Sequence, residues 1–156
     1  MKSGYTLIEI LIVLVIIGLL FTAGYANFRN YARQQALTGA ARALQLDLRT
    51  TQEYANAGNK PSSCDSTNLL NGYQFNVTSN STYEIDAVCT QGNVQIKQIT
   101  LPAGITISTP NPNPIIYKSL AQGTNIVTGT SASIILSQQA TGNRKTVTIG
   151  ANGNVQ

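Results

Sequence analysis

The chain has 156 residues, of which only 10% are charged, and its formal net charge is +4. It contains no histidine and two cysteines. These counts exclude a histidine-based catalytic triad, a zinc site with histidine ligands and a zinc site made of cysteines alone. The sequence also lacks a phosphate-binding glycine loop. We therefore expect a protein that is not an enzyme and that uses no metal or other cofactor.

Residues 5–26 form the most apolar segment of the chain. They include 17 apolar residues out of 22 and a single charge, Glu9. A helix of this length spans about 33 Å, close to the thickness of a bilayer core. Three interpretations compete: a plain transmembrane anchor, a secretory signal peptide cleaved after Ala26, and a segment in which Glu9 has a specific role.

Glu9 favours the third interpretation. A carboxylate inside a membrane span costs about 2.5–3.5 kcal/mol, and neither an anchor nor a signal peptide needs one. If the chain is cut after Gly4, Tyr5 carries a free α-amine at the start of a helix and Glu9 lies one turn further on. The helix dipole stabilises a carboxylate there. In a bundle of such helices, we hypothesise that Glu9 of one copy pairs with the amine of the next and sets the axial register.

The order Lys2-Ser3-Gly4, then Tyr5 to Glu9, then a long apolar stretch resembles the class III signal of type IV pilins and pseudopilins. The resemblance implies that a prepilin peptidase cuts after Gly4 and that the new N-terminus, Tyr5, is methylated. It also implies a role for Glu9 in assembly and methylation. Tyr5 stands where the family usually has Phe, and Ala26 stands where many pilins have a proline that kinks the helix.

The resemblance further implies where the protein resides. The precursor would cross the bacterial inner membrane once, in contact with its lipid, with the C-terminal part outside the cytoplasm. It would then join other pilin or pseudopilin subunits in a pilus or pseudopilus. Arg29 and Arg33 after the span outnumber Lys2 before it, so the positive-inside rule alone predicts the opposite orientation.

The helical pattern continues over residues 27–57, after a leader at 1–4 and a transmembrane or assembly segment at 5–26. The run at 57–61 contains Gly58 and Pro61 and ends the helix. The arginines in this region indicate a solvated face, contacts between subunits or contacts with acidic lipid. Small apolar residues recur at helical spacing and predict one buried stripe: Leu37, Ala41, Leu44, Leu48 and Ala55.

Residues 58–156 follow a β pattern, with apolar and polar residues alternating between turn signals. The predicted strands are centred on residues 73–77, 83–87, 94–99, 105–107, 115–117, 134–136 and 147–149. Alternation predicts one solvated face and one face packed on the helical stripe at Leu44 and Leu48. The expected fold is therefore α+β, a long N-terminal helix packed on a mostly antiparallel β-sheet head, as in pilins.

The end of the head resembles that of the H-type minor pseudopilins and related minor pilins. The resemblance lies in the apolar residues 115–117, the strand at 133–136, a turn at Gly142 and the final segment 147–155. This family often has Arg after the last glycine, where this chain has Asn154. The resemblance implies a minor structural subunit of a type II secretion pseudopilus or of a type IV pilus.

Cys64 and Cys89 are the only cysteines. In an exported head we expect them to form a disulfide, which stabilises by about 2–4 kcal/mol and would pin the linker to the sheet edge. Two unpaired buried thiols are the alternative. Glu84 and Asp86 share one face of a strand, where we expect solvated acids rather than a cation site.

Two other functions stay open from the sequence. The head is mildly basic, and a DNA-binding minor pilin of an uptake pilus would use such charges on phosphates. The aromatic residues that a single-strand binder interleaves with its basic residues are missing. A membrane-anchored β domain that never polymerises is the other alternative. The basic residues of the head that bear on DNA binding are Lys97, Lys118, Arg144 and Lys145.

Overall fold

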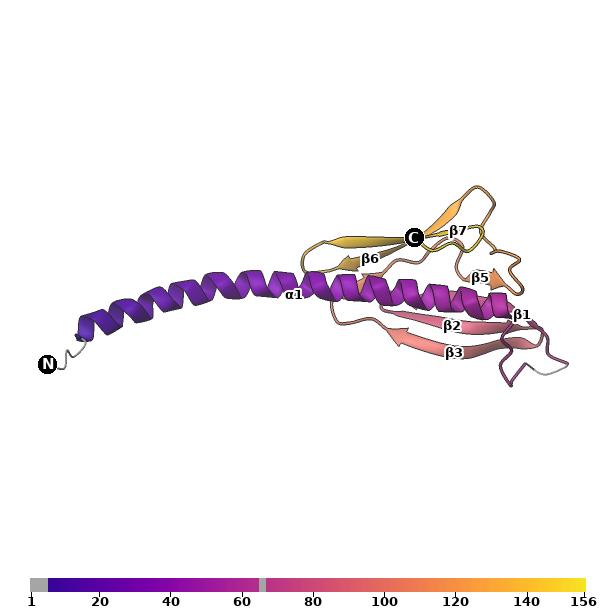
Figure 1. Ribbon diagram of the computed structural model, residues 1–156, viewed down its shortest axis with the longest axis horizontal. Coiled ribbons are helices and arrows are strands. Elements are labelled where there is room, and N and C mark those ends of the chain that lie inside the picture. Colours follow the sequence, from indigo (N-terminus) through magenta and orange to yellow (C-terminus); the bar gives the residue numbers. More distant parts are fainter. Residues whose placement is uncertain (1–5, 65–66) are drawn as a thin grey trace.

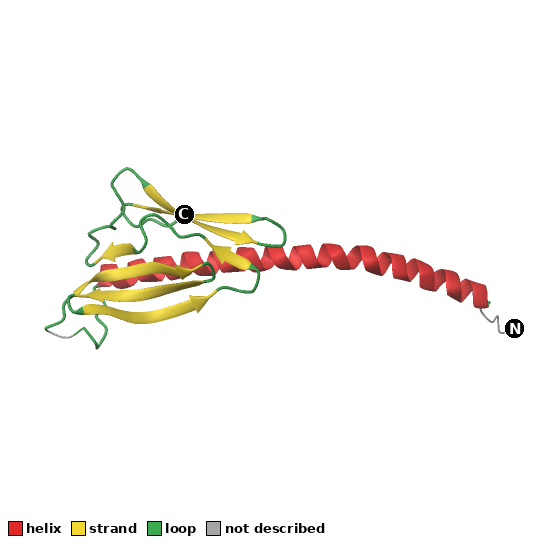
Figure 2. Cartoon of the chain, turned by 180° about the vertical axis from the view of Figure 1, so that it is seen from behind, coloured by secondary structure: helices red, strands yellow, loops and turns green. Residues whose placement is uncertain are grey.

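The computed structural model describes residues 6–64 and 67–156, without the side chains of residues 22–24 and 26. Within these ranges the chain forms one long helix, α1, followed by seven strands (Figure 1). The strands build a head around the C-terminal half of α1, and the N-terminal half of α1 projects away from the head (Figures 1 and 2). The predicted α+β fold is confirmed.

Helix α1 (Leu7–Ala57) has 51 residues and is therefore about 77 Å long. It is continuous, with a gentle curve and no sharp kink (Figure 1). The helix ends where Gly58 adopts a left-handed conformation, at φ +60°, and its N–H donates to the carbonyl oxygen of Ala55 at 3.1 Å. Glycine tolerates this cap because it has no Cβ. The predicted helix end at Ala57 is confirmed.

The C-terminal half of α1 carries the buried stripe. The residues that face the head recur every three or four positions, as helical geometry requires. Every described side chain from residue 6 to residue 32 is exposed, by contrast. Among the residues that the structure describes, no helical stretch is long and apolar enough to cross a membrane. The stripe consists of Leu37, Ala40, Ala41, Leu44, Leu48, Thr51 and Ala55, and so includes every predicted position.

The larger of the two sheets is antiparallel and has the strand order β3-β2-β1-β5. Its inner face is apolar: Phe75 on β1 and Ile85 on β2 are paired in register, and both are buried. Alternate positions point the other way, as the pattern predicted. The four strands are β1 (Leu70–Ser79), β2 (Thr82–Cys89), β3 (Gly92–Thr100) and β5 (Ile115–Lys118).

The second sheet is also antiparallel, in the order β4-β6-β7. Its strands are β4 (Ile105–Ile107), β6 (Ser131–Gln138) and β7 (Arg144–Gly150). Both sheets contact α1, the first through β1 and β5 and the second through β6 and β7. The helix therefore completes two separate sheets, whereas the sequence had indicated only that strands pack on it.

Two glycines bring the backbone of the head close to its neighbours. A Cβ at Gly72 on β1 would collide with the backbone carbonyl oxygen of Tyr117 on β5. Gly153, at φ +86°, packs against the side chain of Gln52 on α1 and the ring of Tyr117. The final turn of the chain thus packs closely on α1. Position 153 needs glycine because of its positive φ and because a side chain there would crowd Gln52 and Tyr117.

Strand β3 departs from the simple alternation that we predicted. The register between β2 and β3 skips one residue, from the pair Ile85–Lys97 to the pair Asp86–Gln95. Ile96 is left unpaired in this β-bulge and remains 40% exposed. As the outer strand of the sheet, β3 has no strand beyond it to complete its cover. No residue of β3 is buried, and only Val94 and Ile99 are partly covered, so this strand is less well packed than expected.

Candidate assembly surface

The N-terminal half of α1 presents an apolar surface on all sides. Helices that pack on a core show a single apolar stripe, whereas a helix that is apolar all round is covered on all sides in its working state. The surface is far larger than the apolar patches of ordinary monomers. Its large exposed residues are Leu7, Ile8, Ile10, Leu11, Ile12, Val13, Leu14, Val15, Ile16, Ile17, Leu19, Leu20 and Phe21.

Glu9 lies in the first turn of α1, as predicted, and its side chain is exposed. Its backbone N–H donates to the carbonyl oxygen of Thr6 at 3.1 Å, so the carboxylate sits beside the positive end of the helix dipole. The same side chain borders a shallow hollow with Ile10, Val13 and Leu14. Within the described residues Glu9 makes no ion pair. Gly4 and Tyr5, the predicted cleavage and methylation positions, lie outside the described residues.

Asp47 on the other half of α1 has the opposite environment. Its Oδ1 is 2.6 Å from the Nζ of Lys97 on β3, and its Oδ2 accepts a hydrogen bond from the hydroxyl of Tyr83 on β2 at 2.8 Å. Burial, together with the adjacent carboxylate, raises the pKa of Tyr83 above its ordinary value. These contacts fix α1 against the larger sheet. No local pattern could predict them, because the partners lie 36 and 50 residues apart.

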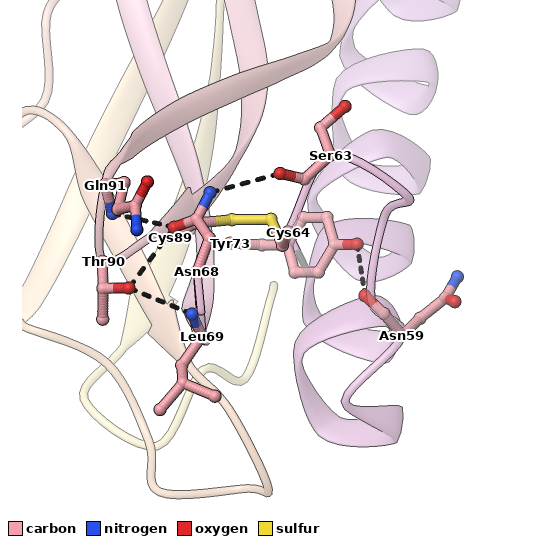
Figure 3. Close-up of a disulfide and its surroundings, with 9 residues drawn as sticks. All are labelled: Asn59, Ser63, Cys64, Asn68, Leu69, Tyr73, Cys89, Thr90 and Gln91. Carbon is pink, nitrogen blue, oxygen red and sulfur yellow. Dashed lines mark hydrogen bonds between the residues drawn. A yellow bond between two sulfur atoms is a disulfide. The ribbon is translucent and has the colours of Figure 1, made fainter. Parts of the chain in front are cut away.

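The disulfide joins Cys64 to Cys89, with 6.1 Å between their Cα atoms (Figure 3). The expected bond is therefore present. We predicted that the bond would tie the linker to the edge of the sheet. Cys89 instead ends β2, an inner strand that lies between β1 and β3. The linker is thus tied to the interior of the sheet and not to its edge. Tyr73 holds the same region, since its hydroxyl donates to the carbonyl oxygen of Asn59 at 2.6 Å.

The two acids on β2 are only partly as expected. Glu84 accepts a hydrogen bond from the side chain of Gln98 at 2.7 Å on the exposed face. Asp86 is only 6% exposed and accepts a hydrogen bond from the side-chain amide of Gln74 at 2.8 Å. The prediction that both acids are solvated is wrong for Asp86. Among the described residues, no cluster of three or more acidic, cysteine or histidine side chains is placed to hold a metal ion.

Four basic residues of the head are divided between its two sheets. Lys97 is engaged by Asp47 and belongs to the larger sheet. Lys118 ends β5, and Arg144 and Lys145 begin β7 in the second sheet. These residues are therefore divided between two sheets, whereas a duplex DNA site would use one continuous basic stripe.

Residues 1–25 match the prokaryotic N-terminal methylation motif, and this match contains Gly4, Tyr5 and Glu9. No curated protein and no solved structure matches the chain. The motif implies a membrane-anchored precursor, processing by a prepilin peptidase and assembly with other pilin subunits. The matched residues include the apolar surface of α1 and Glu9, and they do not include the head. The chain carries the N-terminal signature of the type IV pilins and pseudopilins.

Proposed function

We propose that this chain is a minor structural subunit of a type II secretion pseudopilus or of a type IV pilus, and that it catalyses no reaction. The observation that carries this proposal is the N-terminal half of α1. It is apolar on every side, projects from the head, bears the methylation motif and contains one carboxylate, Glu9. The resemblance of the chain's ending to the H-type minor pseudopilins supports the minor role.

The precursor crosses the inner membrane with residues 5–26 and holds its head outside the cytoplasm. Cleavage after Gly4 leaves Tyr5 as the N-terminus, and its amine is then methylated. Glu9 lies four positions after Tyr5, which corresponds to about 6 Å along a helix axis. A neighbouring helix shifted along the axis can therefore bring its own Glu9 to the amine.

Assembly packs the apolar helix halves side by side and removes them from lipid. Each Glu9 then needs a partner, because a buried carboxylate without one costs several kcal/mol. The amine of the next subunit meets this need at one axial offset only. In this scheme, apolar packing holds the helices of neighbouring subunits together, and Glu9 sets their axial offset. The head remains outside the helical core and is displayed on the filament.

Mass spectrometry of the mature N-terminus tests the proposal. The protein should be isolated from a host that has its own prepilin peptidase, and the expected N-terminus is methylated Tyr5. A Ser3→Ala variant should be processed normally, whereas Gly4→Leu should block cleavage. An intact Met1, or a mature chain that begins at Asn27, would refute the proposal.

A further inference from the structure

A short aromatic and basic segment separates the apolar half of α1 from the head. Tyr25, Phe28 and Tyr31 are large and exposed, at 59%, 68% and 61%. Arg29 lies among them, and Arg33 follows two residues after Tyr31. The guanidinium carbon of Arg29 is 5.8 Å from the centre of the Tyr25 ring. This mixture differs from the mainly aliphatic surface before it and from the buried stripe after it.

Such a mixture matches the chemistry of a membrane–water interface. Tyrosine rings favour the level of the lipid headgroups, and arginine extends its stem along apolar groups while its charge stays in water. The distance also fits, since Leu7 to Tyr25 covers about 27 Å of helix and the hydrocarbon core is about 30 Å thick. Tyr25 therefore reaches one boundary of the core when the helix begins at the other.

The charges of this segment have one sign. Residues 10–46 contain three arginines and no acid. Arg33 and Arg29 precede Leu37 by four and eight residues, so both lie on the helix face that continues into the buried stripe. They therefore lie on α1 just N-terminal to the part of the helix that the head covers. The Arg33 side chain is half-buried.

The head also carries positive charge near the exposed half of α1. The β6–β7 turn lies at the end of the head that is nearest to the exposed half of α1 (Figures 1 and 2). Arg144 and Lys145 follow this turn directly, and both are exposed. Strand β7 therefore begins at the end of the head that is nearest to Arg29 and Arg33, although the Arg144 side chain lies beside Thr106 and Ser137 of the second sheet.

We propose that residues 25–33 form an interface collar that binds the headgroups of anionic phospholipids before assembly. Arg29 and Arg33 contact lipid phosphates, and Tyr25, Phe28 and Tyr31 lie at the boundary between headgroups and acyl chains. Lys145, exposed at the start of β7, extends this contact to the head. The collar fixes the depth of the helix and keeps the head close to the membrane surface. It rests on the proposed function, because it requires α1 to reside in the bilayer.

The chain has no tryptophan, so one substitution gives a unique fluorescent probe of depth. The full-length protein is reconstituted in phosphatidylcholine vesicles that contain phosphatidylglycerol, with Phe28→Trp as the collar probe and Leu14→Trp as the reference. Lipids brominated near the headgroup should quench the probe at residue 28 most strongly. Lipids brominated near the chain end should quench the probe at residue 14 most strongly.

The charge contribution is measured in the Phe28→Trp protein by comparing quenching by brominated phosphatidylglycerol and brominated phosphatidylcholine. Replacing Arg29 and Arg33 by Gln should reduce the preference for the anionic lipid about fivefold for each arginine. The matched control replaces Arg42 and Arg49, two exposed arginines further along the same helix, and should leave the preference unchanged.

The outcomes separate the collar from the proposed function. An unchanged lipid preference after loss of Arg29 and Arg33 overturns the collar. A probe at residue 28 that emits as in water, beside a probe at residue 14 that lies in the acyl chains, also overturns it. If both probes emit as in water, the helix does not enter the bilayer and the proposed function fails as well.

Discussion

The two halves of α1 share one backbone and differ in what covers their side chains. In the C-terminal half, the apolar residues form one stripe, which two β-sheets of the same chain bury. In the N-terminal half, apolar residues surround the helix and no described residue of the head covers them. The apolar residues of the C-terminal half are covered within the molecule. Those of the N-terminal half have to be covered by lipid or by other subunits.

The acids of the two halves differ in the same way. Asp47 is satisfied within the chain by Lys97 and by the hydroxyl of Tyr83. Glu9 has no ion pair in the part of the chain that the structure describes. The contacts of Asp47 stabilise the fold, whereas the proposed role of Glu9 is to pair with another subunit during assembly. The predictions below test this division.

Truncation of a leucine should affect the two halves very unequally. Leu44 is fully buried under the head, so Leu44→Ala should lower the free energy of unfolding by about 2–5 kcal/mol. Leu14 is 63% exposed, and Leu14→Ala should leave the stability of the head unchanged. Urea unfolding of both variants in detergent, followed by circular dichroism, measures the difference. Equal destabilisation by the two substitutions would contradict the division.

Loss of the disulfide should weaken the head alone. Replacing Cys64 and Cys89 by Ser should lower the free energy of unfolding by about 2–4 kcal/mol, because the unfolded chain gains freedom. Reduction of the wild-type protein should give the same shift in the urea midpoint. The lipid depth of a tryptophan at residue 14 should not change. A midpoint that is insensitive to reduction would show that the bond does not support the head.

Alkaline pH should also act on the head. Burial raises the pKa of Tyr73, Tyr83 and Tyr117 in the folded protein, whereas unfolded tyrosine titrates near pH 10. The stability due to these groups is fully present below pH 10 and is lost as the pH rises further. Between the pKa of the unfolded state and the higher pKa of the folded state, Tyr83 and Tyr117 each contribute a slope of at most about 1.4 kcal/mol per pH unit. Unfolding midpoints measured from pH 9 to 12 should fall, and Tyr83→Phe should make this fall shallower. A flat profile would contradict this account.

The smallest effect is expected at the contact between helix and sheet. Asp47→Asn should lower the free energy of unfolding by about 1 kcal/mol, since Lys97 is half exposed and water compensates part of the loss. Glu53→Gln, at an exposed position six residues further along α1, is the matched control and should have no effect. A double-mutant cycle with Lys97→Gln isolates the pair, and strictly additive effects would show that it contributes no coupling.

Much of this fold was predictable because its patterns are local. Alternation with a period of two marked the cores of the strands, and the spacing of Leu37, Leu44 and Leu48 marked the buried stripe. Gly58 and Pro61 predicted the helix end. The position of Glu9 followed from one charge in an apolar run, which needs no knowledge of the fold.

Other features depend on contacts between distant parts of the chain. The pairing of Asp47 with Lys97 requires the β-bulge at Ile96, which turns Lys97 towards the helix side of the sheet. The burial of Asp86 depends on Gln74, which register and not sequence spacing brings beside it. The division of the strands into two sheets is also a property of pairing. A pattern within one strand carries no information about these partners.

The role of Glu9 in assembly is the central claim, and incorporation of a Glu9→Ala variant tests it most directly. In cells that carry the cognate assembly system, the variant and a matched Glu53→Ala variant are compared in the membrane and in the sheared filament fraction. The account predicts that both are exported and form the disulfide, but that only Glu53→Ala reaches the filaments. Incorporation of Glu9→Ala at the wild-type level would contradict it.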